Sequence, residues 1–379
     1  MSSDDIAETP SPKKKHFYWI DWVRFVAALM VVVCHSRGYN WVAWGNLNPK
    51  DQSTASEVFL AVTRPAVEWV VVFFVLSGFL IGGRLIEQSL KKTFDPWSFA
   101  IDRLIRIWLP LIPALVLTAI IEYYCGVPIR WVEMLGNVAG LQGVICDNFA
   151  NNVPLWSLSY EIWFYVLGGC VALIVAKPGK SFLPFIGTAV CFVIFTRLSA
   201  TLLNCWLLGA VSSFLIARQK GIVSGSLGLF LVLLGVASCQ FQASSVSIEE
   251  RSLHFLKWLP PTNMALLILS CGLGLVIADI CLRQPHSVLT IQVERLGTHL
   301  AAFSYTMYLT HYPLLNLWNH FIPERSLRFD VASCLIFVSK LLSCLLAGWL
   351  IYLPFEAQTS KVKSWFRRQS MSCFEKREG

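Results

Sequence analysis

Arg24 and His35 lie in the first apolar stretch of the chain, and their spacing puts two chemically active side chains on one helix face. Eleven positions correspond to about 1100° of rotation, within about 20° of three full turns. The helical rise separates them by roughly 16 Å along the axis. A histidine can act as a general base on a hydroxyl group, and an arginine fork matches phosphate oxygens. The pair therefore predicts a helix with a base toward one end and an anion-binding group toward the other.

Two further titratable residues are expected at the depth of His35. Glu161 follows the start of the apolar stretch 156–176, and His311 lies in the stretch 300–319. Inserting a charged side chain into a bilayer costs about 2.5–3.5 kcal/mol of free energy on insertion scales, so such residues in a span indicate a structural or functional role. A carboxylate and two imidazoles at one level would form a buried polar site. The alternatives are that His35 only packs through a hydrogen bond and that Glu161 only caps or anchors a helix.

A group of arginines is expected at the opposite depth, beside Arg24. Arg84, Arg103 and Arg106 lie at the ends of apolar stretches, and the last two share a helix face because they are three residues apart. Such a cationic mouth suits a phosphate-bearing molecule. Coenzyme A has the required shape, with phosphates at one end and an acyl thioester on a long thin arm. The alternative is that these arginines only mark the cytoplasmic side or extend toward lipid head groups.

The elements that must position these side chains are membrane helices. Of the 379 residues, 55% are hydrophobic and 14% are charged, whereas a soluble domain has about 45–50% apolar and about 25% charged residues. This composition excludes an ordinary soluble enzyme and a disordered chain. Ten apolar stretches are long enough, or nearly so, to cross a bilayer: residues 19–38, 67–84, 104–122, 156–176, 183–198, 201–217, 226–243, 264–282, 300–319 and 331–353.

The distribution of basic residues predicts how these spans are oriented. With the N-terminus in the cytoplasm, the inner segments hold 20 Lys and Arg residues and the outer segments hold 8. This asymmetry follows the positive-inside rule. The stretches 183–198 and 201–217 could also form one long broken helix, but merging them would break the pattern downstream. We therefore expect ten spans with both termini cytoplasmic, and the net charge of +8 indicates membrane orientation and not nucleic-acid binding.

The sequence predicts an all-α polytopic membrane protein of the cell inner membrane in three segments. They are a cytoplasmic tail at 1–18 leading into an uncleaved signal anchor, a transmembrane domain at 19–353, and a basic cytoplasmic tail at 354–379. Most of the twelve cysteines lie inside spans, where cysteine acts as a small apolar residue, and none has metal-ligand spacing. Cys125 and Cys146 share an outer loop, so a disulfide between them is one option.

Five motifs, in this order along the chain, resemble those of the acyltransferase-3 family of integral membrane acyltransferases. Each is weak alone, but together they reach from residue 21 to residue 313 on a ten-span frame. They are Asp21 with the pattern of Arg24, ten residues and His35, then residues 73–79, 103–110 and 156–161, and finally residues 304–313.

The resemblance implies transfer of an acyl group, acetyl first and succinyl as an alternative, from cytoplasmic acyl-CoA to a glycan hydroxyl. The acceptor would be a surface or exported polysaccharide, such as an exopolysaccharide, or its lipid-linked precursor. By the same resemblance His35 is the essential histidine with Arg24 as its partner, Arg103 and Arg106 bind the donor, and Glu161 and His311 match recurrent motif positions. No metal is implied. The alternative function is a proton-coupled transporter of a small anionic or sugar solute, because intramembrane titratable residues also mark carriers.

Overall fold

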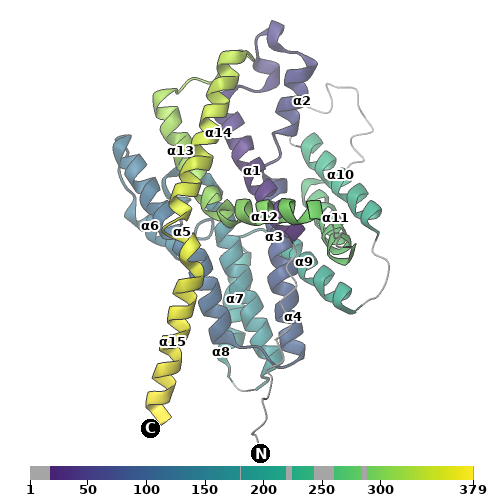
Figure 1. Cartoon of the computed structure of the whole chain (residues 1–379), viewed down its shortest axis with the longest axis vertical. Coiled ribbons are helices and arrows are strands. Elements are labelled where there is room, and N and C mark those ends of the chain that lie inside the picture. The colour runs from purple at the N-terminus through teal and green to yellow at the C-terminus, as the bar shows by residue number, and fades with distance from the viewer. Residues whose placement is uncertain (1–17, 180, 219–223, 243–259, 284–287, 379) are drawn as a thin grey trace, which may run out of the picture.

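The computed structural model describes residues 18–179, 181–218, 224–242, 260–283 and 288–378, and in these ranges the regular elements are helices, without strands (Figure 1). The all-α prediction is confirmed. The predicted N-terminal tail lies outside the described residues up to residue 17. Eight helical stretches are long and apolar enough to cross a membrane: Tyr18–Asn40, Thr54–Leu90, Pro96–Tyr124, Val153–Ala176, Ala200–Arg218, Gly225–Gln242, Thr262–Arg283 and Val331–Gln369.

Fifteen α-helices follow one another in the described part of the chain, and one π-helical segment, Gly78–Gly82, joins the third to the fourth. The helices are α1 (Tyr18–Asn40), α2 (Thr54–Val62), α3 (Val67–Ser77), α4 (Gly83–Leu90), α5 (Pro96–Tyr124), α6 (Trp131–Val138), α7 (Trp156–Ala176), α8 (Leu183–Phe195), α9 (Ala200–Arg218), α10 (Gly225–Gln242), α11 (Thr262–Arg283), α12 (Val288–Ala302), α13 (Ser304–Phe321), α14 (Val331–Tyr352) and α15 (Thr359–Glu378).

Two of the ten predicted spans differ from an ordinary membrane helix. The stretch 183–198 forms α8, which is apolar but has 13 residues and is therefore only about 20 Å long. It is separate from α9, as the charge pattern predicted. The stretch 300–319 forms α13, whose Ser304, Thr306, Thr310 and His311 are buried. A helix enclosed by other helices of the bundle can carry such polar side chains because they meet protein groups instead of lipid.

The predicted loop at 283–299 is largely helical, which corrects the expectation for this region. Residues from Val288 onward form α12, which lies across the direction of the other helices (Figure 1). The chain turns at Phe303, and α13 begins at the next residue. The Thr298 hydroxyl donates to Asp21 at 3.0 Å, and the Trp22 indole donates to the Val293 carbonyl at 2.9 Å. These hydrogen bonds hold α12 against the N-terminal part of α1. The number of charged residues in the segment 283–299 could not predict this contact, because its partners are far apart in the sequence.

The C-terminal end of α1 is fixed by a buried lysine of α14. The Lys340 ammonium is 1% exposed and donates to the Tyr39 carbonyl at 2.9 Å and to the Asn40 side-chain oxygen at 3.2 Å. The Asn40 amide in turn donates to the Ser333 carbonyl at 2.9 Å. A cation at the end of a helix is stabilised by the unpaired carbonyls and by the helix dipole. α1 is therefore held at both ends, by α12 and by α14.

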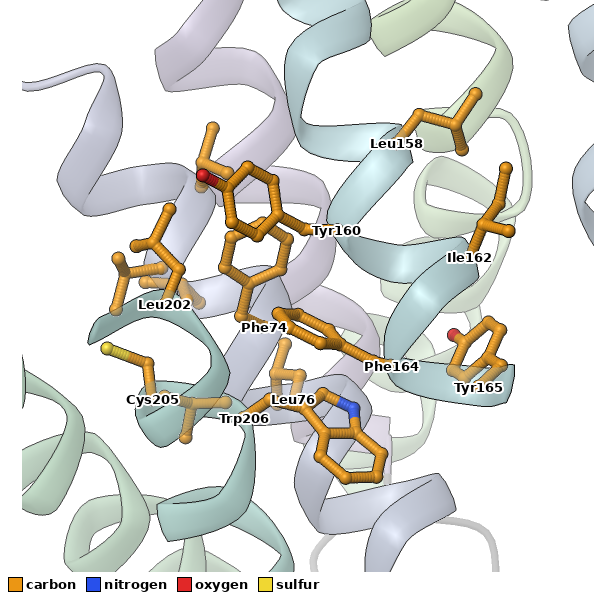
Figure 2. Packing of buried hydrophobic residues seen from close by; sticks show 14 of the residues in the cluster. Phe74, Leu76, Leu158, Tyr160, Ile162, Phe164, Tyr165, Leu202, Cys205 and Trp206 are labelled. Carbon is orange, nitrogen blue, oxygen red and sulfur yellow. The ribbon is translucent and has the colours of Figure 1, made fainter. Parts of the chain in front are cut away.

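Aromatic rings fill the space between α3, α7 and α9. Phe74 meets Phe164 edge-on with ring centroids 5.2 Å apart, and Phe164 stacks on Trp206 at 5.6 Å. Figure 2 shows Tyr160 and Phe164 on the side of α7 that faces α9, and Tyr165 on the other side. α7 thus packs against α9 with one face, and Tyr165 lies on the opposite face.

Glycines let the π segment and α9 approach backbone to backbone. A Cβ atom at Gly78 would collide with the Trp206 carbonyl oxygen, and one at Gly209 would collide with the Val75 carbonyl oxygen. Small residues at such crossings allow membrane helices to pack closely. The contact holds the π segment against α9.

Cys125 and Cys146 are both free thiols in the structure, so the optional disulfide is not formed. Cys146 packs against Gly136 of α6. Partial burial, followed by the charges of Glu133 and Asp147, raises the pKa of the Cys146 thiol. The loop is held by hydrogen bonds, among them those from the Asn137 amide to the carbonyls of Glu133 and Asp147.

We expect Gly78→Ala to destabilise the protein, because overpacking a close contact costs about 1–3 kcal/mol. Gly38→Ala is the matched control: Gly38 lies in α1 with nothing within 4 Å of an added Cβ, and alanine favours a helix by about 0.8–1 kcal/mol over glycine. The measurement is the midpoint of thermal unfolding of the purified protein in detergent. Equal midpoints for the two variants would show that the glycine contact is not tight.

Candidate active site

A cavity of about 360 Å³ lies among α1, α3, α4, α5, α7 and α13 and gathers four cations with one carboxylate. Its lining includes Arg24, Arg84, Arg103, Arg106 and Glu161. The volume is within the range of roughly 300–1,000 Å³ that small-molecule sites occupy. The four arginines predicted to share one depth are therefore in one cavity, and we call it the arginine cavity.

The π segment directs one edge of the helix pair α3–α4 into the arginine cavity. Ser77, Leu80, Ile81 and Arg84 line it, while the glycines of the segment face α9. A π turn is wider than an α turn and is often found at functional sites. In this helix it separates a glycine face that packs from a face that lines the cavity.

Arg106 is held by an acidic residue from the far end of the chain. Its guanidinium contacts the Glu356 carboxylate at 2.5 Å, and it lies over the Tyr305 ring with 5.3 Å to the ring centroid. The second Glu356 oxygen accepts from the Thr306 amide at 3.1 Å and from the Thr306 hydroxyl at 2.6 Å. Glu356 thus caps the N-terminus of α13 and neutralises part of the Arg106 charge.

The other arginines are less fully paired. The Arg103 guanidinium lies over the Tyr165 ring at 5.4 Å, and its Nε is buried without a hydrogen-bond partner. Arg24 has Asp21 at 3.8 Å, a distance too long for a direct hydrogen bond. Arg84 is exposed at the rim. The cavity lining therefore keeps positive charge and N–H groups that can bind an added anion.

A chain of hydrogen bonds orients Glu161. The Tyr165 hydroxyl donates to Glu161 Oε1 at 2.6 Å. The Tyr165 hydroxyl oxygen is 3.1 Å from the Ser77 hydroxyl. The Ser77 hydroxyl accepts a hydrogen bond from the Trp206 indole at 3.2 Å. Because the indole can only donate and the carboxylate can only accept, the proton order runs from Trp206 through Ser77 and Tyr165 to Glu161. The sequence placed Glu161 beside the histidines, but the structure places it in the arginine cavity.

The two histidines expected at one depth are in direct contact. His35 Nδ1 and His311 Nε2 are 2.9 Å apart, and the two rings lie edge to edge and nearly coplanar, with 5.2 Å between their centroids and 7° between their planes. The Tyr312 ring meets His35 edge-on at 5.2 Å. His311 is fully buried, while His35 keeps some exposure. The pair is thus held in one orientation, with His35 as the less buried member.

The hydrogen-bond partners assign a tautomer to each ring. His311 Nδ1 is 2.7 Å from the Tyr308 carbonyl, which can only accept, so Nδ1 carries a proton. In the neutral ring Nε2 is then an acceptor, and His35 Nδ1 must donate to it. His35 Nε2 is left with a free lone pair and, within the described part of the chain, no hydrogen bond. This nitrogen can accept a proton from a bound hydroxyl group.

One turn of α13 connects the arginine cavity to the histidine pair. Tyr308 and Leu309 line the cavity, and the Tyr308 carbonyl is the group that fixes His311. The Tyr308 side chain is anchored outside α13, at 2.8 Å from the Ser157 hydroxyl and 3.1 Å from the Pro154 carbonyl. An anion in the cavity and a hydroxyl at His35 would therefore be held by one continuous set of contacts.

Sequence reasoning missed Glu356, Tyr305 and the positioning roles of Tyr165 and Ser77. A signal for Glu356 existed, because an isolated carboxylate directly after an apolar span is costly unless it finds a partner. Tyr305, Tyr165 and Ser77 fell inside motifs that were noted but assigned no contact. Among the described residues, no group of three or more His, Cys, Asp or Glu side chains is arranged for a metal ion.

Comparison with known protein families identifies the family of this chain. A family model described as an acyltransferase domain of the acyltransferase-3 type matches residues 17–353. No curated protein and no solved structure matches the chain. The matched residues include all that line the arginine cavity and both histidines, whereas Glu356, the partner of Arg106, lies beyond the match.

We expect Glu356→Gln to lower the stability of the protein by about 1–3 kcal/mol, because a buried, charge-assisted network loses its ionic partner. Glu87→Gln is the matched control. Its ion pair with Lys91 is at the surface, with exposures of 59% and 64%, and such pairs contribute about 0–1 kcal/mol. Thermal unfolding in detergent measures both variants. A loss no larger than that of the control would contradict a stabilising role for the Arg106–Glu356 pair.

Proposed function

Because the chain belongs to the acyltransferase-3 family, we propose that this membrane acyltransferase moves an acyl group from acyl-CoA to a hydroxyl group of a glycan or of its lipid-linked precursor. Acetyl is the acyl group we propose, and the cell inner membrane is the proposed location. The observation that supports this proposal is the cavity with four arginines, whose α13 wall leads within one helical turn to His311 and so to its partner His35, the histidine with a free lone pair.

The donor is proposed to bind with its phosphates in the arginine cavity. Arg103 offers the terminal N–H groups of its guanidinium, and Arg84 offers an exposed guanidinium at the rim. Guanidinium groups bind phosphate oxygens in a fork geometry that fixes orientation as well as charge. The arm of the donor then extends along α1 and α13 toward His35, about 16 Å from Arg24 along the helix. This reach suits a long thin carrier with the thioester at its far end.

His35 is proposed as the general base that activates the acceptor. Its Nε2 takes the proton of the hydroxyl group while the oxygen forms a bond to the thioester carbonyl carbon. The resulting tetrahedral intermediate collapses with cleavage of the carbon–sulfur bond, and the leaving thiolate takes the proton back from His35. The products are an O-acyl ester and the free thiol of coenzyme A. General-base catalysis of this kind contributes about 10²–10⁴-fold.

His311 is proposed as the positioning residue of this base. By accepting from His35 Nδ1, it holds the tautomer in which Nε2 is unprotonated, and it stabilises the ring after proton uptake. The Tyr308 carbonyl fixes His311 in turn. A nucleophile and base aligned by a third group is a recurring arrangement in acyl transfer, and here the acceptor hydroxyl is the nucleophile.

We expect His35→Ala to abolish acylation, whereas His311→Gln retains part of it and His311→Leu loses nearly all. Glutamine can place an acceptor oxygen near the position of His311 Nε2, and leucine cannot. The His311 variants should lose activity through a lower kcat, whereas KM for the donor should change little. The extent of acylation is measured as O-linked acyl content of surface glycans, by NMR and mass spectrometry, in a host lacking this gene and complemented at matched membrane levels. The split between kcat and KM is measured as the acylation rate at varied acetyl-CoA concentration with the purified variants.

His320→Ala serves as the control, because His320 lies at the exposed end of α13. Identical glycans in the host without the gene, with wild type and with His35→Ala would overturn glycan acylation. Equal activity of His311→Gln and His311→Leu would overturn the positioning role.

We expect Arg24→Lys, and Arg103→Ala combined with Arg106→Ala, to weaken acetyl-CoA binding by more than tenfold. Lysine keeps the charge of Arg24 but lacks the planar fork. Binding of radiolabelled acetyl-CoA to purified protein measures the effect. The double variant should be paired with the thermal midpoint, since Arg106 also stabilises the fold. A transporter would not require this binding, so wild-type protein without affinity for acetyl-CoA would favour the transporter function instead.

A further inference from the structure

A second cavity, of about 510 Å³, lies between α5, α7 and α8, and its lining is almost wholly apolar. Phe94, Phe99, Leu104, Trp108, Val166 and Leu173 are among the lining residues. It shares two residues with the arginine cavity, Arg103 and Tyr165. We call it the apolar groove. The proposed reaction does not use this space.

The apolar groove is open toward the surface that faces lipid. Leu104, Leu183 and Ile186 line it and are 51%, 72% and 49% exposed. α8, which forms one wall, is about 20 Å long and covers only part of a hydrocarbon core of about 30 Å. A hydrocarbon chain can therefore enter the groove sideways from the bilayer.

Among the described residues, Arg103 is the one charged residue that lines the groove, and it lies at the boundary with the arginine cavity. Its Nε is buried and has no hydrogen-bond partner, while its guanidinium lies on the Tyr165 ring. It is the eighth residue of α5, about 10 Å from the start of that helix. The groove thus combines an apolar lining with a single cation, which lies between Ala100 and Leu104 on the α5 wall where the two cavities meet.

We propose that the apolar groove binds one hydrocarbon chain of a phosphate-bearing membrane lipid, with the lipid phosphate against Arg103. The apolar wall removes the chain from the bilayer at little cost, and Arg103 gains the acceptor oxygen that its Nε lacks. This site goes beyond the proposed function, since neither the donor nor the glycan occupies the groove. Arg103 lines both cavities, and in this proposal its Nε binds the lipid phosphate while its terminal nitrogens remain for the donor phosphates.

The acyl chain of the donor is a poorer occupant of this groove. In the proposed function the donor phosphates lie among the arginines and the thioester lies at His35, about 16 Å farther along α1. An acyl chain would therefore start at the end of the donor that is distant from Arg103. A lipid has its phosphate next to its chains, which matches a cation that lies directly beside an apolar wall.

Photoreactive lipids in nanodiscs test this site on the full-length protein. One probe is phosphatidylglycerol with a diazirine in one acyl chain, and the other is diacylglycerol with the same chain and no phosphate. Cross-linked residues are mapped by mass spectrometry. We expect phosphatidylglycerol to label residues 94–108, 162–173 and 183–187 at least fivefold above other lipid-facing segments, and diacylglycerol to label them much less.

Two variants separate the groove from the general lipid surface. Val166→Trp fills the groove and should lower its labelling at least fivefold, whereas Val171→Trp should not. Both valines are on α7 with 39% and 44% exposure, and only Val166 lines the groove. Arg103→Leu should reduce phosphatidylglycerol labelling to the diacylglycerol level.

Uniform labelling along the lipid-facing helices, or equal labelling in the Val166→Trp and Val171→Trp variants, would overturn the groove site. Equal labelling by the two probes in wild type would overturn the role of the phosphate and Arg103. Acetyl-CoA binding is measured on the same samples and should persist in Val166→Trp. Loss of donor binding in wild type, with groove labelling intact, would count against the proposed function and leave the lipid site standing.

Discussion

The cost of placing cations inside a helical membrane bundle is the constraint on which the rest of this structure depends. Each buried guanidinium must find compensation nearby, because a charge in a low-dielectric surrounding is expensive when unpaired. Glu356 compensates Arg106, and the Tyr165 ring only partly compensates Arg103. The hydrogen-bond partners of these arginines are incomplete, because the Nε–H of Arg103 is buried and makes no hydrogen bond. An anionic ligand is the natural group to complete it.

The π segment has two sides with different functions. Its glycines pack against α9, and its other side lines the cavity. Gly78 and Gly209 bring the π segment against α9 without intervening side chains. The irregular turn then directs Ser77 and Arg84 toward the cavity. α13 begins directly after a break at Phe303, so its free N-terminal amides can be capped by a carboxylate from beyond α14. Local departures from α-helix thus occur where a side chain or a helix end is needed in the site.

Much of this arrangement could be predicted from the sequence, because helical period and hydropathy are local properties. The face shared by Arg24 and His35, and the pairing of His35 with a histidine of α13, follow from span order and residue depth. The depth of Glu161 was not predictable in this way. Its position depends on how far α7 is displaced along its axis relative to α1, and that offset is set by side-chain packing. The contact between Arg106 and Glu356 joins residues 250 positions apart, and no spacing rule addresses it.

The proposed mechanism depends on the distance between Arg24, in the arginine cavity, and His35, the proposed base, and both residues lie on α1. If the anion-binding groups lay beside His35, their charge would oppose the proton uptake that a general base requires. Eleven residues of α1 keep Arg24 about 16 Å from His35, while the helix still fixes their relative position. A donor bound as proposed would have to bridge that distance with an uncharged arm, so the length of the carrier would become a criterion of recognition. A short acyl phosphate could satisfy the arginines or reach the histidine, but it could not do both.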